Sequence, residues 1–210
     1  MGAVKAADEK LMTNFTVVQH AILLQPETRM NIQMNNRGER IYLRFLNMED
    51  AASLLDVQLR NRAVFEEISA SERSETFYTL EGQVTLLEGW NKAREEGKRY
   101  SFGIFLNTTN ELIGEISLFE LELDSTQKWI VGYVLDQAHN GKGYMSEALG
   151  LALNFAMNDA GIKRVEAGAL PDNAGSIRVL RKAGFQEMDR QNIKIRGIWK
   201  EHLMFAVDLR

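Results

Sequence analysis

The chain has 210 residues, with 25 Lys and Arg against 29 Asp and Glu, a formal net charge of −4 and no cysteine. Its 45% hydrophobic and 26% charged residues are typical of globular proteins and exclude collagen-like, disulfide-stapled and wholly disordered chains. The absence of cysteine excludes thiolate zinc sites and cysteine nucleophiles, and the acidic balance argues against a nucleic-acid partner. The three histidines, His20, His139 and His202, are too scattered for a helical metal-binding pair, so we expect no metal.

The amino-terminal part differs in texture from the rest of the chain, and we interpret residues 1–37 as an N-terminal extension and residues 38–210 as one domain. The apolar stretch 15–24 is interrupted by polar residues and is shorter than the roughly 20 residues of a membrane span. No small-residue cleavage site comes after it. We therefore expect no membrane contact and a cytoplasmic location. The extension is either an upstream translation feature or an arm for packing or dimerisation, so monomer and homodimer both stay open.

The first predicted elements of the domain are a strand at 40–46, a helix beginning at 49–50 and a longer helix over 74–96. Apolar residues of the long helix step by three or four and are expected to form one core-facing stripe: Phe77, Leu80, Val84, Leu87, Trp90 and Ala93. Gly97 is expected to end this helix.

The next predicted elements are strands at 100–106, 111–119 and 128–136, of which the last is continuous enough to be a buried central strand. A polar loop at 137–143 leads to a helix at 144–160. A strand at 163–170, a helix at 173–181 and two strands turning at Gly197 complete the chain, at 185–196 and 198–209. This order predicts an α/β fold with one mixed sheet and helices on both faces.

The loop before the predicted helix at 144–160 carries the most informative pattern. Gly141 and Gly143 permit positive φ and a close approach of the backbone to a ligand. Amide groups that lead into a helix amino terminus form an anion site, and Lys142 adds a positive charge. We therefore expect a phosphate or pyrophosphate here, although the pattern matches neither the P-loop nor the dinucleotide fingerprint. A tight strand-to-helix turn without a ligand is the alternative.

A second pattern lies in the segment that opens the helix at 173–181. Asn173 and Ser176 are three residues apart, which puts both polar groups on one side of the helix start. The alternative is that Asn173 is only the N-cap and Ser176 only a polar residue of the first turn.

Together the two patterns resemble the GNAT superfamily of acetyl-CoA dependent N-acetyltransferases, and within it the Rim-type enzymes that acetylate ribosomal-protein amino termini. The resemblance covers roughly residues 40–209. It is carried by Asn140-Gly-Lys-Gly-Tyr-Met-Ser-Glu-Ala148 together with Asn-x-x-Ser-x-Arg-x-Leu-x-x-x-Gly-Phe at 173–185. It implies a single domain with a mostly antiparallel twisted sheet, which has a V-shaped split between two central parallel strands.

The resemblance also implies residue roles. The pantetheine arm of acetyl-CoA would bond to the backbone of Tyr133, Val134 and Leu135 and to the side chain of Asn173. The pyrophosphate would sit on the amides of Asn140, Gly141, Lys142, Gly143, Tyr144 and Met145. Ser176 would protonate the departing thiolate, and an amide near Val134 would bind the oxyanion. Asn140 stands where the family pattern has Arg or Gln, and Met145 stands where it has Gly or Ala.

The general base stays open. Glu115, Glu120 and Glu122 are candidates because the resemblance puts this strand opposite the acetyl group, and a water relay would also suffice. No carboxylate stands near Ile193, where related Rim-type enzymes can carry Glu. We interpret His139 as a solvent-facing loop residue. The predicted function is acetyl transfer to a protein N-terminal amine, plausibly of a ribosomal protein. The alternatives are acetylation of a small amine (a polyamine, an amino acid or an antibiotic) and a non-catalytic CoA-binding module.

Overall fold

The computed structural model describes residues 36–69, 72–123 and 126–209. The extension expected over residues 1–37 therefore lies outside the described residues, except for its last two. Asn36 is buried, and its carbonyl accepts a hydrogen bond from the Leu43 amide at 2.8 Å. Arg37 forms a β-bridge with Tyr42. Both residues thus pack as part of the domain.

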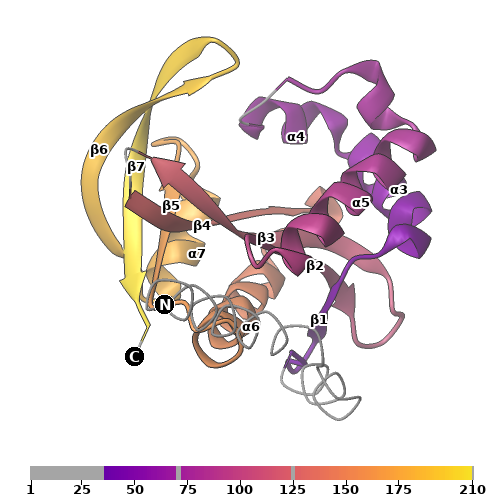
Figure 1. The fold of residues 1–210 in the computed structure, drawn as a ribbon, viewed down its shortest axis with the longest axis horizontal. Coiled ribbons are helices and arrows are strands. Elements are labelled where there is room, and N and C mark those ends of the chain that lie inside the picture. Colours follow the sequence, from indigo (N-terminus) through magenta and orange to yellow (C-terminus); the bar gives the residue numbers. More distant parts are fainter. Residues whose placement is uncertain (1–35, 70–71, 124–125, 210) are drawn as a thin grey trace, which may run out of the picture. The chain divides into compact units, whose positions relative to one another are not determined.

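One seven-stranded sheet forms the centre of this domain, in the order β1-β2-β3-β4-β5-β7-β6 (Figure 1). Its strands are β1 (Ile41–Phe45), β2 (Arg99–Leu106), β3 (Leu112–Leu123), β4 (Thr126–Leu135), β5 (Arg164–Ala169), β6 (Gln186–Ile195) and β7 (Ile198–Asp208). Among these strands β4 and β5 are the parallel pair, and the other neighbours are antiparallel. The predicted mixed, mostly antiparallel sheet is confirmed.

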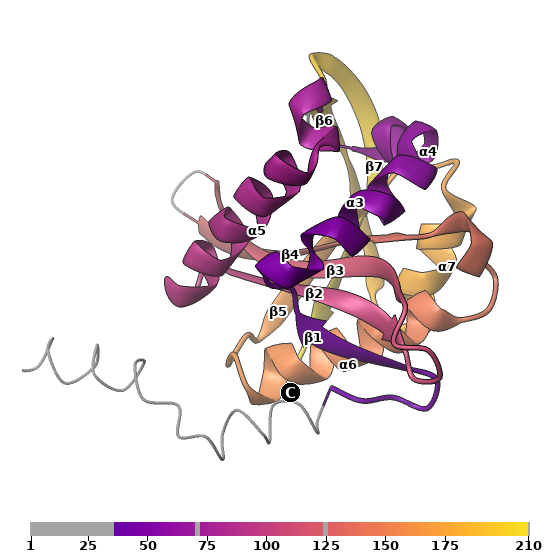
Figure 2. The same cartoon turned by 90° about the vertical axis from the view of Figure 1, so that its right-hand side faces the viewer.

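Helices cover both faces of the sheet, as predicted. Figure 2 shows α3, α4 and α5 above the sheet and α6 below it, and α7 packs against α6. The helices are α3 (Ala51–Arg60), α4 (Arg62–Ile68), α5 (Leu80–Glu95), α6 (Tyr144–Asn158) and α7 (Ala174–Lys182), with 3₁₀ turns η1 (Met48–Asp50), η2 (Glu75–Tyr78) and η3 (Gln137–His139). In the described part of the chain, no helix has both the length and the apolar character required to cross a membrane.

The predicted helix at 74–96 is wrong in its first turn. The backbone is extended at Thr79 (φ −119°, ψ 158°), so η2 ends there and α5 begins at Leu80. Thr79 caps α5, because its hydroxyl oxygen accepts a hydrogen bond from the Gly82 amide at 3.1 Å. The break removes Phe77 from the stripe and leaves Leu80 52% exposed. Leu87 is fully buried as expected, and Gly97 (φ +70°) follows the end of the helix.

The two faces of the sheet have separate cores. On the face that carries α3, α4 and α5, a buried cluster joins Leu46, Ala51, Leu54, Val57, Phe65, Leu87, Phe105 and Leu112. On the other face Phe155 of α6 packs edge-on against the rings of Phe45, Tyr100 and Phe102 at centroid distances of 5.0–5.8 Å. Both cores hold the central strands in place between them.

The split expected between two central parallel strands is present. β4 and β5 pair at Trp129 with Val165 and at Ile130 with Glu166. Beyond these positions β4 continues to Leu135 and β5 to Ala169, without further pairing between them. In contrast, β3 and β4 pair along their whole common length. The two strands therefore diverge and open a gap in the middle of the sheet.

Candidate active site

A cleft of about 300 Å³ follows the split between β4 and β5. Residues 131–134 of β4 and 167–170 at the end of β5 line it. Asn173 and Ser176 reach it from the α7 side. Residues from the end of α4, from β2 and β3 and from the β6–β7 hairpin line it on the other side. The cleft is thus accessible to groups from both faces of the sheet.

On the α7 side, the hydroxyl groups of Tyr133 and Ser176 lie 2.9 Å apart and form a hydrogen bond. Burial raises the pKa of the Tyr133 phenol, and the hydrogen bond to Ser176 partly opposes that rise. Asn173 is the N-cap of α7, because its Oδ1 accepts a hydrogen bond from the Ser176 amide at 3.0 Å. The cap fixes the first turn and with it the Ser176 hydroxyl. Sequence reasoning assigned Tyr133 a backbone role only and missed its phenol.

The glycine loop before α6 has the conformation that its sequence requires. Gly141 and Gly143 have φ of +75° and +81°, which favour glycine. Gly143 is the N-cap of α6 and has no side chain that could accept a hydrogen bond from the first turn of that helix. Asn140, Gly141 and Lys142 are exposed. Free amide groups at an exposed helix amino terminus fit a phosphate or pyrophosphate.

A residue more than one hundred positions earlier in the chain holds this loop. Arg40, just before β1, donates from Nη1 to the Lys142 carbonyl at 2.6 Å and from Nε to Glu147 Oε2 at 2.9 Å. Its guanidinium also lies over the Tyr144 ring, 5.2 Å from the centroid. Sequence reasoning missed Arg40, because no local pattern connects it to the loop.

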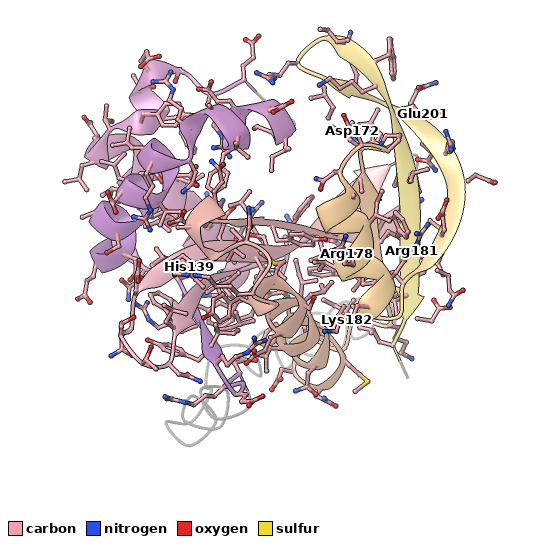
Figure 3. All side chains as sticks on the ribbon, turned by 180° about the vertical axis from the view of Figure 1, so that it is seen from behind. His139, Asp172, Arg178, Arg181, Lys182 and Glu201 are labelled. Carbon is pink, nitrogen blue, oxygen red and sulfur yellow. The ribbon has the colours of Figure 1, made fainter. Side chains whose placement is uncertain are left out.

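Additional positive charge stands on the same face of the sheet. Figure 3 shows Arg178, Arg181 and Lys182 on α7, which packs against α6. All three side chains are exposed, and Arg181 pairs with Glu187 at 2.7 Å. Exposed cations of α7 thus stand on the face that carries the glycine loop, although the chain has a net charge of −4.

Glu115 lies on the opposite face of the sheet and lines the cleft. It pairs across the strands with Val134, which packs against the core under α3 and α5. Its Oε2 is enclosed and has no hydrogen-bond partner among the described residues. Burial raises the pKa of the Glu115 carboxyl, and the charges of Arg99 and Arg73 oppose part of this rise. A carboxylate in this setting is suited to accept a proton.

The other carboxylate candidates are not brought to the cleft. Glu120 pairs with Trp129, whose ring stacks on Tyr100 in the core on the α6 side. It therefore lies on the face opposite Glu115 and does not line the cleft, and its interpretation as a base facing the acetyl group is wrong. The side chain of Glu122 is outside the described residues.

Two histidines differ from their sequence interpretation. His139 is not solvent-facing: its side chain is 14% exposed, and its ring lies 6.0 Å from that of Tyr144 (Figure 3). It is not among the residues that line the cleft. His202, which was considered only as a metal ligand, is buried on β7 and lines the cleft, with its Nδ1–H donating to the Lys200 carbonyl at 2.9 Å. Within the described ranges, no group of three or more His, Asp and Glu side chains gathers as a metal site.

Known proteins resemble this chain in sequence and in fold. A model of the acetyltransferase (GNAT) domain matches residues 40–186. The probable N-acetyltransferase YjcK of Bacillus subtilis (strain 168) is 41% identical over 173 residues, which are 81% of this chain and 95% of the relative. The [ribosomal protein uS5]-alanine N-acetyltransferase of Escherichia coli (strain K12) is 28% identical over 171 residues, 80% of this chain and 88% of the relative. Mycobacterium smegmatis RimJ, solved in complex with CoA-disulfide, has a TM-score of 0.70 at 22% identity and covers 80% of this chain and 81% of its own. The chain belongs to the GNAT family of acetyl-CoA dependent N-acetyltransferases.

Proposed function

We propose that this acetyltransferase modifies the α-amine at the amino terminus of a protein, such as a ribosomal protein. The relative in Escherichia coli named for alanine acetylation of ribosomal protein uS5 supports this choice of acceptor. The observation that carries the proposal is the division of the cleft. Ser176 and Tyr133 lie on its α7 side, and Glu115 lies on the opposite face of the sheet. A proton donor and a proton acceptor thus approach the split from opposite faces.

The α7 side and the glycine loop fit acetyl-CoA. At Tyr133, Val134 and Leu135 the edge of β4 that faces the split has no partner on β5, so backbone groups there are available to the pantetheine arm. The amides of residues 140–145, of which Asn140, Gly141 and Lys142 are exposed, are proposed to bind the pyrophosphate, with the charge of Lys142 beside them. Because the Oδ1 of Asn173 caps α7, we expect this side chain to contact the pantetheine through its Nδ2 amide.

The chemistry is direct transfer within a ternary complex. A protein α-amine has a pKa of about 7.7–8.0, so a large share is protonated at neutral pH and must lose a proton before attack. Glu115 accepts that proton, and the amine nitrogen then forms a bond to the thioester carbonyl carbon. The amide of Val134 is proposed to stabilise the oxyanion. The carbon–sulfur bond breaks, and the Ser176 hydroxyl donates its proton to the departing thiolate while Tyr133 holds the hydroxyl in place. The nitrogen loses its second proton as the amide forms, and this proton restores the Ser176 hydroxyl.

A panel of acceptors tests this function. Purified protein is mixed with acetyl-CoA and with peptides that begin with Ala or Ser, with spermidine or with free amino acids, and released thiol is measured. We expect turnover with peptides and little with the other amines. Turnover of free small amines alone would reject the peptide acceptor. A rise in melting temperature with acetyl-CoA but no thiol release with any acceptor would favour a non-catalytic binding module.

A further inference from the structure

Arg99, the first residue of β2, is held in a fixed orientation beside the cleft. Its Nε donates to Ser101 Oγ at 2.8 Å, and its Nη2 donates to Ser117 Oγ at 3.1 Å. The rings of Trp90 and Phe119 lie 4.8 and 5.2 Å from the guanidinium carbon. Hydroxyl groups and aromatic rings orient this cation, but neither kind of neighbour neutralises its charge.

No described carboxylate forms an ion pair with Arg99. The side chain is half-buried, and burial lowers the pKa of its guanidinium against the raising effect of Glu115. Two of its five N–H groups bond to the two serines, which leaves donors for a ligand in the cleft that it lines. A partly desolvated cation without an ion-pair partner is a favourable place for a ligand carboxylate.

Glu115 and Arg99 carry opposite charges in the same cleft but do not touch. The guanidinium reaches Ser117, which is two residues from Glu115 on the same face of β3. Two residues of strand span about 7 Å, so the guanidinium beside Ser117 is displaced along β3 by roughly this length from the position of Glu115. The cleft therefore presents a negative group and a positive group spaced by about two residues of extended chain.

We infer that Arg99 is a specificity-determining residue that binds a carboxylate of the acceptor, with the reacting amine at Glu115. An extended peptide advances about 3.3–3.6 Å per residue, so 7 Å from the α-amine reaches the second or third residue. The acceptor is then a peptide amino terminus with an acidic residue at position two or three. A free amino acid carries its amine and carboxylate on one carbon, too close to reach both groups. This inference rests on the proposed function.

The remaining charges of the cleft agree with an acidic acceptor. Arg73, Arg99 and Lys200 line it with positive charge, against the two carboxylates Glu67 and Glu115. A surplus of positive charge attracts an acceptor whose overall character is acidic, even though the reacting amine is a cation.

The test compares peptides of equal length that begin with Ala and differ only in carrying Asp or Asn at the second or at the third position. For the wild-type enzyme we expect kcat/KM to be about tenfold or more higher with Asp. Arg99→Gln should abolish this preference while its affinity for acetyl-CoA stays within twofold of wild type. Arg99→Lys should keep part of the preference, because the charge remains without the planar fork.

Arg190→Gln is the matched control. Arg190 is an exposed cation of β6 that pairs with Glu201 at 2.6 Å and does not line the cleft, so its removal should leave the preference intact. Equal kcat/KM for the Asp and Asn peptides with the wild-type enzyme would overturn the role of Arg99 and leave the proposed function standing. Turnover of free aspartate without turnover of any peptide would overturn the peptide acceptor itself. Because the Asp and Asn peptides are compared with the wild-type enzyme, the preference for an acidic acceptor is tested even if an Arg99 variant fails to fold.

Discussion

Gly114 of β3 should be intolerant of any side chain, because β4 lies against it. A Cβ at this position would lie 2.4 Å from the carbonyl oxygen of Val134 and 3.1 Å from the Cα of Leu135, whereas ordinary contact begins at 3.4 Å. Both neighbours are backbone atoms and cannot rotate away. In Gly114→Ala the strand must therefore move by about 1 Å at the place where we propose that the pantetheine arm and the oxyanion bind.

The magnitude follows from the hydrogen bonds at risk. Misplacing two backbone hydrogen bonds of about 0.5–1.5 kcal/mol each weakens acetyl-CoA binding by about 1–3 kcal/mol, or roughly 5- to 150-fold in Kd. The overpacked strand should also lower the free energy of unfolding by about 1–3 kcal/mol. Titration calorimetry with acetyl-CoA measures the first effect and urea unfolding the second.

Gly150→Ala in α6 is the control for a glycine-to-alanine change. A Cβ at Gly150 meets no atom within 4 Å, so this variant should bind acetyl-CoA normally and gain about 0.5–1 kcal/mol in stability. If Gly114→Ala folds and binds acetyl-CoA within twofold of wild type, the backbone of β4 at Val134 and Leu135 does not contribute to the coenzyme site, and the reasoning is refuted.

Four further substitutions test the proposed roles and the ion pair of Asp136. Ser176→Ala should lower kcat about 100-fold with an unchanged Kd for acetyl-CoA. Tyr133→Phe removes one supporting hydrogen bond and should lower kcat by about 2- to 10-fold. A larger loss of kcat in Tyr133→Phe than in Ser176→Ala would make Tyr133 the proton donor and Ser176 its support. Glu115→Gln should abolish turnover. Because burial raises the pKa of Glu115, the wild-type protein loses stability as pH rises through that pKa, so urea unfolding should show the variant to be increasingly more stable than wild type between pH 4 and pH 8. A variant that becomes less stable than wild type over this range would contradict the reasoning. Burial alone would raise the pKa of Asp136, but the hydrogen bonds from Arg60, the Ala138 amide and Asn61, together with the charge of Arg60, outweigh it and lower the pKa. Asp136→Asn should therefore cost about 1–3 kcal/mol at pH 7 and much less once the pH falls through this lowered pKa. An equal cost at acidic and neutral pH would exclude the interactions of the ionised carboxylate as the cause.

Much of the local geometry of the proposed coenzyme side could be predicted, because its signals are local. Positive φ at Gly141 and Gly143 follows from the absence of a side chain, and the helix start at Asn173 follows from its capping propensity. The spacing from Asn173 to Ser176 likewise fixes their relation within one turn. Each of these features depends on fewer than ten consecutive residues, so sequence alone is enough to find it.

The break in the long helix could not be predicted from periodicity. Phe77 and Leu80 fit the spacing of a helical stripe, but the Thr79 hydroxyl accepts from the Gly82 amide and donates to the Thr76 carbonyl. This local bonding offers the backbone an alternative to the helix ladder. The spacing of apolar residues does not indicate whether the helix ladder or the local hydrogen bonds of Thr79 form.

Apart from Glu115, which was one of three candidate carboxylates in the sequence, the proposed acceptor side could not be predicted, for a different reason. Arg99, Glu115 and His202 lie on three strands, and no motif relates them. Their meeting depends on the register of β2 with β3 and on the order of β5 and β7 in the sheet. The family resemblance marks the neighbourhood of Ile193 as a possible place for a carboxylate, and Ile193 belongs to β6. His202, which lines the cleft, lies on the neighbouring strand β7.

The pleat of β4 explains why the proposed proton donor and proton acceptor lie on opposite faces of the sheet. Tyr133 and Val134 are consecutive in β4, so their side chains point to opposite faces of the sheet. Tyr133 meets Ser176 on the α7 side, and Val134 lies beside Glu115 on the side of α3 and α5. If a thioester lies along this strand, the group that protonates its leaving sulfur and the group that deprotonates the attacking amine approach it from different faces. Amine and thiolate need not then pass each other, and residues that we propose to select the acceptor, such as Arg99, can vary without disturbing the proposed coenzyme site.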